Sequence, residues 1–145
     1  MYELYKLVFW PSMTAKRLNA TAFTKKSGNY IGRESDGIGG FREIFGESEH
    51  TLQLNCSRFW FYGARFPSRY DYNFKYNGAN YVIDQGAGAR DEGKLLHYSG
   101  ELVNTNVTLE IKAPVDLLIY CIYYEEVKIP ISVGLHLMDP QYSGM

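Results

Sequence analysis

The stretch from residue 58 to residue 76 combines aromatic rings with positive charge. Nine of its nineteen residues are aromatic, and four basic residues stand against one acidic residue. Rings stack on flat ligands, and guanidinium groups hold phosphates or carboxylates through paired hydrogen bonds. This composition is typical of a site for a nucleotide, a single-stranded nucleic acid or a phospholipid headgroup, and bare rings also suit sugars.

Five residues of this stretch form the predicted ligand-binding set: Arg58, Trp60, Arg65, Arg69 and Tyr72. We expect the arginines to contact the negative charge of the ligand and the rings to stack on its flat part. The competing interpretation is that alternate rings fill the core while the basic residues are solvated at its rim. The two interpretations differ in which faces of 58–62 and 70–76 meet solvent.

No segment of the chain resembles a catalytic or cofactor motif. Cys56-Ser57-Arg58 and Tyr98-Ser99-Gly100 differ from the strand–turn–helix elbow that presents a nucleophilic serine. The glycine-rich stretches 37–40 and 86–93 lack the spacing and the Lys-Ser/Thr ending of phosphate loops. We therefore predict no catalytic residue and no cofactor, and a protein that is not an enzyme.

The three histidines do not predict a metal site either. His50, His97 and His136 have no second histidine or cysteine at ligand-pair spacing, so the predicted metal ligands are none. An enzymatic alternative needs a deep pocket that joins His97 or His136 to an acid such as Asp84 or Glu101.

Charge is nearly balanced over the whole chain but not along it. Of 145 residues, 15 are basic and 16 acidic, which gives a net charge of −1 and argues against a general polyanion binder. Residues 1–90 carry +4 and residues 91–145 carry −5. Either the two halves form differently charged solvated faces, or a bipolar surface steers an anionic partner or supports head-to-tail self-association.

The cysteines and the N-terminus indicate a protein of the cytoplasm. Two cysteines, Cys56 and Cys121, do not make a disulfide scaffold, and whether they are bridged stays open. The first residues lack the basic and then apolar pattern of a signal peptide, and no stretch is long enough to span a membrane. We predict a cytoplasmic location and no transmembrane segment.

About ten short segments with strand-like patterns are separated by turn residues. Alternation is cleanest from Tyr70 to Tyr76, where four rings share one face; Asn77-Gly78 then predicts a hairpin with 79–84. Leu18–Thr24 and Tyr30–Arg33 are predicted strands joined by a turn at 25–29. The segments 52–57, 107–112 and 129–137 also alternate, and 41–45 is a further short strand candidate. Residues 58–62 are apolar on both faces, which indicates a strand covered on both sides or one lining a binding surface.

The segment 115–126 is apolar on all sides, so its period does not distinguish a buried strand from a buried helix. Pro114 suits a helix start, whereas the aromatic and β-branched content suits a strand. We favour a helix because Pro114–Tyr124, together with Gly28–Gly32, resembles the tubby C-terminal-like superfamily, which includes the scramblase-like and LURP-one-related proteins. The resemblance implies a β-barrel threaded by this helix, and binding at anionic headgroups without catalysis.

These observations predict one β-rich domain over 1–138, followed by a flexible tail over 139–145. Its fold is all-β, or mainly β with one buried helix near 115–126, as a compact barrel or sandwich. The predicted function is non-catalytic binding of an anionic small molecule or headgroup on an aromatic and basic surface. The alternative is a protein-interaction module, such as an inhibitor or assembly subunit, that uses strand edges and exposed rings as hot spots.

Overall fold

A computed structural model describes residues 10–65, 71–83, 91–114 and 117–128. Nine strands and one 3₁₀ turn make up the regular structure of these residues, so the predicted all-β class is confirmed. The elements are β1 (Lys16–Asn19), η1 (Ala20–Ala22), β2 (Thr24–Ser35), β3 (Phe41–Asn55), β4 (Arg58–Arg65), β5 (Tyr72–Tyr76), β6 (Ala79–Ile83), β7 (Asp91–Tyr98), β8 (Asn106–Ala113) and β9 (Leu117–Glu125).

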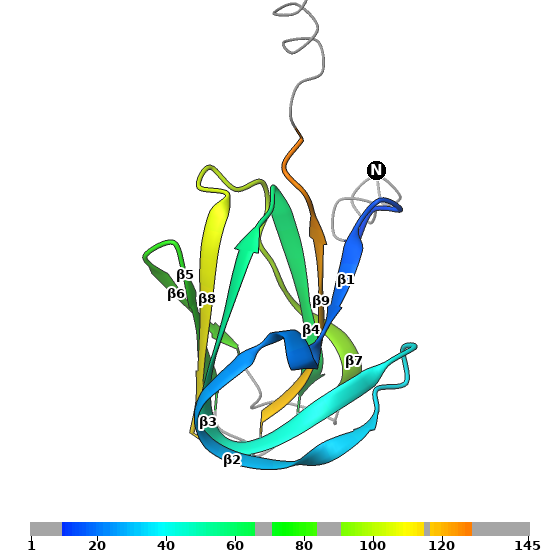
Figure 1. Cartoon of the computed structure of the whole chain (residues 1–145), viewed down its shortest axis with the longest axis vertical. Coiled ribbons are helices and arrows are strands. Elements are labelled where there is room, and N and C mark those ends of the chain that lie inside the picture. The colour runs from blue at the N-terminus through cyan, green and yellow to red at the C-terminus, as the bar shows by residue number, and fades with distance from the viewer. Residues whose placement is uncertain (1–9, 66–70, 84–90, 115–116, 129–145) are drawn as a thin grey trace, which may run out of the picture.

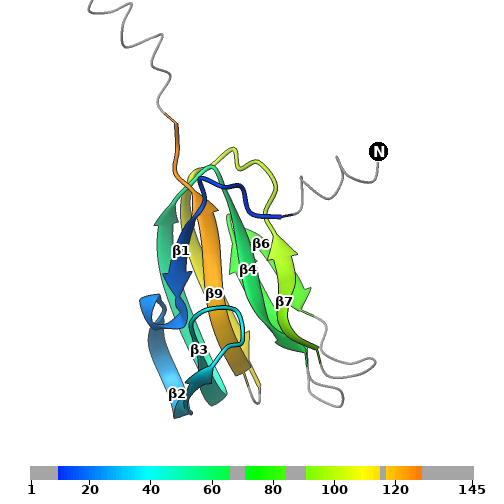
Figure 2. The same cartoon turned by 90° about the vertical axis from the view of Figure 1, so that its right-hand side faces the viewer.

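The strands form one antiparallel sheet in the order β6-β5-β8-β3-β9-β4-β7, with β1 added on β9 and β2 on β3. Strand β3 is long enough to belong to both halves of this sheet. Its residues 48–55 pair with β8, and its residues 43–45 pair with β9. Figures 1 and 2 show the resulting curl, which brings β5, β6 and β8 opposite β4 and β9.

The space between the two halves holds the main hydrophobic core. Every second residue of β5 and β8 points into it, as the alternating burial of both strands shows. Phe59 and Phe61 of β4 meet Phe74 of β5 there, with Phe61 and Phe74 centroids 4.7 Å apart. The predicted hairpin is confirmed, because Asn77 and Gly78 both have positive φ, as a two-residue turn between β5 and β6 requires.

A second apolar layer covers the opposite face of β4 and β9. We call it the aromatic layer, and its buried members are Trp60, Tyr62, Ala64, Leu118, Tyr120 and Cys121. The side chains of β4 alternate between the main core and the aromatic layer. Both faces of the strand are therefore covered, which explains why both are apolar. The register of β9 against β4 shifts next to Tyr62, which lets the consecutive residues Tyr120 and Cys121 both belong to the aromatic layer.

The segment expected to be a helix is a strand. Residues 117–125 form β9, which pairs with β1, β3 and β4, so its continuous apolar run reflects a strand buried on both faces. The central helix that the family resemblance implies is therefore not formed by these residues. The strand predicted over 129–137 and the tail predicted over 139–145 lie outside the described residues, and the domain bounds stay a prediction.

The turn predicted at 25–29 is also wrong, because β2 runs without interruption from Thr24 to Ser35. Three register shifts against β3 absorb the turn-forming residues as bulges. Among the described residues no strand pairs with the outer edge of β2. Bulges make such an edge irregular and work against the addition of another strand, so the predicted use of strand edges by a partner gains no support from β2.

Both cysteines are free and buried. Cys56 lies in the main core and Cys121 in the aromatic layer, so the two thiols belong to different layers. Burial raises the pKa of each thiol to about 11, which keeps them protonated at neutral pH.

Candidate functional site

Arg58, the first residue of the predicted site, is held by an acidic partner of the same chain. Its Nε donates to Glu125 Oε1 at 2.6 Å and its Nη2 donates to Glu125 Oε2 at 3.1 Å. The guanidinium also lies 5.1 Å from the Trp60 ring centroid, and its Nη1 donates to the Tyr98 hydroxyl. The hydrogen bonds to Glu125 raise the pKa of Arg58. An incoming anion would therefore compete with a carboxylate that already has good geometry.

Two further members of the predicted site, Trp60 and Tyr72, do not share a surface. Trp60 is fully buried and stacks on Tyr98 in the aromatic layer, whereas Tyr72 is buried in the main core. The backbone of Arg65 in β4 lies opposite that of Asp91 in β7, and Arg69 lies outside the described residues. The structure thus brings Arg58 and Trp60 together and places Tyr72 in the other layer. That the five residues bind an anion stays a prediction.

The outer face of β3, β8 and β5 is polar and faces solvent, and β6 continues it with Asn80 and the exposed apolar side chain of Val82. Its side chains form two rows across the strands. In the first row Glu49 lies opposite Lys112, and Lys112 lies opposite Asn73. The second row is Thr51, Glu110, Lys75 and Asn80, each opposite the next. The rows lie about 7 Å apart along the strands, and four strands span about 14 Å.

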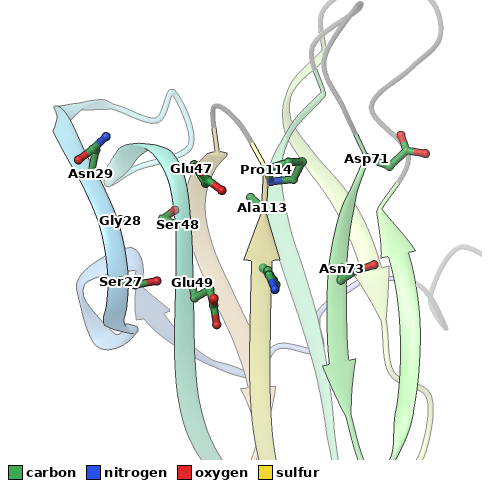
Figure 3. Close-up of a pocket in the computed structure, with 11 residues that line it drawn as sticks. Ser27, Gly28, Asn29, Glu47, Ser48, Glu49, Asp71, Asn73, Ala113 and Pro114 are labelled. Carbon is green, nitrogen blue, oxygen red and sulfur yellow. The ribbon is translucent and has the colours of Figure 1, made fainter.

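Two neighbouring hollows follow these rows. The first, of about 450 Å³, lies where β8 ends and β5 begins. Figure 3 shows it between Ser27, Gly28 and Asn29 of β2 on one side and Asp71 and Asn73 on the other. The second, of about 590 Å³, extends over the second row as far as Gln53 and Thr108. The hollows share Glu49, Asn73 and Lys112, so we treat them as one site, the polar groove.

Donors and acceptors are mixed throughout the polar groove. Three lysines line it: Lys26, Lys75 and Lys112. Four carboxylates line it: Glu47, Glu49, Asp71 and Glu110. The net charge of minus one disfavours a polyanion, and the amides of Asn73 and Asn80 and the hydroxyls of Thr51 and Thr108 add neutral hydrogen-bonding groups. Such a surface suits a ligand whose groups both donate and accept hydrogen bonds.

Gly28 lets β2 pass close enough to β3 to form the wall of the groove. Gly28 lies opposite Ser48 and has a φ of +102°, which side chains rarely permit. A Cβ at this position would lie 2.1 Å from the carbonyl oxygen of Glu47, closer than any two such atoms can approach. The wall therefore depends on this glycine.

A buried serine–histidine pair lies beneath the groove. Ser48 Oγ donates to the Gly46 carbonyl at 2.9 Å and lies 2.8 Å from His50 Nε2. Because the single hydroxyl proton goes to Gly46, His50 Nε2 must be the donor to Ser48. A histidine that activates a serine nucleophile instead accepts its proton. Burial also lowers the pKa of His50 to about 4, and its ring packs on Phe45. In this arrangement His50 Nε2 is not placed to take the proton of Ser48.

His97, proposed above as a partner in an enzymatic alternative, is enclosed by rings. Its Nε2 lies 2.7 Å from the Tyr76 hydroxyl, and the rings of Phe59, Phe74 and Tyr81 surround it. Burial lowers its pKa to about 4. Of its expected acidic partners, Glu101 is exposed, and Asp84 lies outside the described residues together with His136.

Within the described ranges, 10–65, 71–83, 91–114 and 117–128, no three side chains of the His, Cys, Asp and Glu types are arranged to hold a metal ion. The same residues contain no helix that is long and apolar enough to cross a membrane.

The polar groove was not identified from the sequence, although part of its signal was present. The alternation of 107–112 and of 70–76 places Thr108, Glu110 and Lys112 on one face of a strand and Asn73 and Lys75 on one face of another. What the pattern lacks is the pairing of β8 with both β3 and β5, which turns separate polar faces into rows. Pairing between distant strands is not encoded in local periodicity.

No family model and no curated protein matches this sequence. Among solved structures, the fold resembles part of a family two carbohydrate esterase from Cellvibrio japonicus, with a TM-score of 0.51 and 11% sequence identity. The match covers 78% of this chain but only 34% of the esterase chain. At this identity the likeness concerns the fold: the same kind of β-rich unit occurs within a carbohydrate-active enzyme.

Two weaker likenesses have TM-scores below 0.5. The CBM36-1 domain of a multidomain xylanase, from the hindgut metagenome of Trinervitermes trinervoides, gives 0.45 at 10% identity over 79% of this chain and 99% of that domain. The catalytic unit of a GH87 alpha-1,3-glucanase from Streptomyces thermodiastaticus gives 0.42 at 15% identity, over 81% of this chain and 27% of that one.

Proposed function

We propose that the protein is a non-catalytic binding module whose polar groove takes a neutral saccharide chain. The observation that carries this proposal is the pair of polar rows, one across β3, β8 and β5 and the other across the same strands and on to Asn80 of β6. A sugar presents adjacent hydroxyls that each donate and accept, and the rows offer carboxylate, ammonium, amide and hydroxyl groups side by side. The distance between neighbouring strands, about 4.8 Å, is comparable with the length of one pyranose unit.

Two observations lead us to propose binding without catalysis: the carboxyl groups of the groove are exposed, and Ser48 donates its proton to a backbone carbonyl. Glu47, Glu49, Asp71 and Glu110 are all exposed. A carboxyl that acts as a general acid at neutral pH is usually buried, because desolvation raises its pKa. Ser48 donates its proton to a carbonyl and not to His50. The groove therefore supports binding better than hydrolysis. The likeness to part of an esterase gives the fold alone and no catalytic residue.

An anionic ligand, the class predicted from the sequence, is less well supported at this face. Carboxylates outnumber ammonium groups in the groove, and the guanidinium of Arg58 is occupied by Glu125. To bind a ligand rich in phosphate or sulfate, the groove would need fewer carboxylates and Arg58 would have to be released from Glu125. Anionic probes therefore form a second arm of the test.

The test is isothermal titration with soluble glucans, xylans, mannans and galactans, and separately with a sulfated glycan and a nucleotide. We expect one neutral class to bind. Lys112→Ala should weaken that binding about tenfold, since a hydrogen bond to a charged group contributes about 1.5–3 kcal/mol. Lys94→Ala is the matched control, because Lys94 is an exposed lysine of β7 that does not line the groove.

Two results would contradict the proposal. The first is equal affinity of the Lys112→Ala variant and the wild-type protein for every neutral polysaccharide that binds. The second is binding of the anionic probes alone, lost in Arg58→Ala and kept in Lys112→Ala, which would support the site predicted from the sequence.

A further inference from the structure

Apart from the polar groove, another hollow lies on the β2–β3 hairpin and includes an exposed aromatic ring. It has a volume of about 140 Å³, and we call it the hairpin pocket. Its lining residues are Asn19, Ala20 and Thr21 on one wall and Arg33, Phe41 and Glu43 on the other. None of these residues lines the polar groove. The hairpin pocket and the polar groove are therefore separate features of the molecule.

The Phe41 ring is the apolar part of this pocket. The side chain is 57% exposed at the start of β3, although burying a phenyl ring is favourable. Scattered exposed rings need no explanation, but this one stands among polar groups that point to the same hollow. The guanidinium of Arg33 lies 5.9 Å from the Phe41 centroid, and the ring still keeps more than half of its surface open.

The polar groups of the pocket are fixed in place before any ligand arrives. The Glu43 side chain is only 7% exposed, and it accepts from Arg33 Nε and Nη2 and from the Tyr30 hydroxyl. Asn19 accepts from Arg17 Nε at 3.1 Å through its Oδ1, so its Nδ2 is oriented as a donor. Thr21 adds an exposed hydroxyl.

The two walls are also fastened to each other. Arg17 of β1 forms an ion pair of 2.6 Å with Asp36, which is at the tip of the hairpin. Asp36 Oδ1 in turn accepts from the backbone N–H groups of Ile38 and Gly40, both at 2.8 Å. The wall that bears Asn19 and the wall that bears Phe41 are therefore held at a fixed spacing, which lowers the ordering cost of binding.

We infer that the hairpin pocket binds a single sugar ring, such as the terminal residue of a saccharide. Its volume suits one six-membered ring. Phe41 offers an apolar surface to the C–H face of the ring, and Asn19 Nδ2, the Thr21 hydroxyl and Arg33 meet hydroxyls at its edge. The pocket has one cation already paired with one carboxylate, which favours a neutral ring over a phosphorylated one.

The inference is tested with methyl glycosides of neutral hexoses and N-acetylhexosamines, which are too short to follow the rows of the polar groove. Binding is measured by amide chemical shifts of the whole protein. We expect shifts at 19–21, 33 and 41–43, and an affinity about tenfold lower in Phe41→Ala. Phe41→Trp keeps a ring and should keep binding. Trp10→Ala, which removes another half-exposed ring, should leave affinity unchanged.

Three results would overturn the inference: no glycoside binds, the shifts fall only in the polar groove, or Phe41→Ala binds as the wild-type protein does. The dispersion of the amide spectrum of each variant shows directly that it is folded. Because the Lys112→Ala variant leaves the hairpin pocket intact, glycosides should bind it normally even if the proposal for the polar groove fails.

Discussion

The two outer faces of the sheet differ in what they present to solvent. The outer face of β3, β8 and β5 carries polar residues at every second position and forms the polar groove. The outer face of β4 and β9 carries the aromatic layer and is buried. Rings gathered in the sequence thus mark a strand covered on both sides, whereas strict alternation marks a face that is free for a ligand.

The largest expected effect is on the aromatic layer. Trp60→Ala should lower the free energy of unfolding by about 3–5 kcal/mol, because it leaves a cavity between Tyr98 and the rest of the layer. Denaturant titration followed by circular dichroism measures this loss. A loss below about 1 kcal/mol would mean that Trp60 is accessible, and the contrast between the two faces would fail.

The next effect concerns the ion pair at the edge of the aromatic layer. Glu125→Gln should cost about 2 kcal/mol at pH 7, since it weakens two charged hydrogen bonds to Arg58. Arg58 lowers the pKa of Glu125 in the folded protein. This stabilisation is therefore complete above the pKa of Glu125 in the unfolded chain and is lost as the pH falls towards its folded value. Between pH 7 and pH 3, the free energy of unfolding should therefore depend less on pH in Glu125→Gln than in the wild-type protein.

A second pH effect should come from two histidines, the buried His50 under the polar groove and the half-buried His97 between the sheet halves. Burial lowers the pKa of both His50 and His97 to about 4, from an ordinary value of about 6.5. The unfolded chain therefore takes up protons first, and stability should fall as the pH drops from about 6.5 to about 4. His50→Gln and His97→Gln should each remove part of this slope in thermal unfolding. A slope unchanged in both variants would contradict the burial of these rings.

The fold class could be predicted from the sequence because alternation and turn residues are local signals. Asn77-Gly78 predicted a hairpin that the structure confirms, and the alternation of Tyr72, Phe74 and Tyr76 placed these rings on one face, which the structure shows to be buried. Residues 117–125 could not be assigned in this way, because a strand buried on both faces has no period. The choice in favour of a helix was therefore wrong.

The candidate site was harder to predict because it depends on pairing between distant segments. Glu49 and Lys112 are far apart in the chain and become neighbours only when β3 pairs with β8. Likewise, Trp60 and Tyr72 look alike in the sequence, but the curl of the sheet assigns them to different layers. Composition counts rings and charges, and topology decides which of them share a surface.

The smallest expected effect is on the stability of the polar groove. Asn73→Ala and Thr108→Ala should each change the free energy of unfolding by less than about 0.5 kcal/mol, because both side chains are exposed on the outer face. Calorimetry at neutral pH measures this. A loss as large as that of Trp60→Ala would mean that these residues are structural, and the two faces would then be alike.

The most direct test of the account is to map which outer face a ligand touches. The wild-type protein, labelled for amide chemical shifts, is titrated with the polysaccharide that binds most tightly. The account predicts that the shifts cluster at Glu49, Asn73, Glu110 and Lys112, across three neighbouring strands. Shifts that cluster instead at Arg58, Trp60 and Tyr98 would contradict it, because they would place the ligand on the face that the aromatic layer closes.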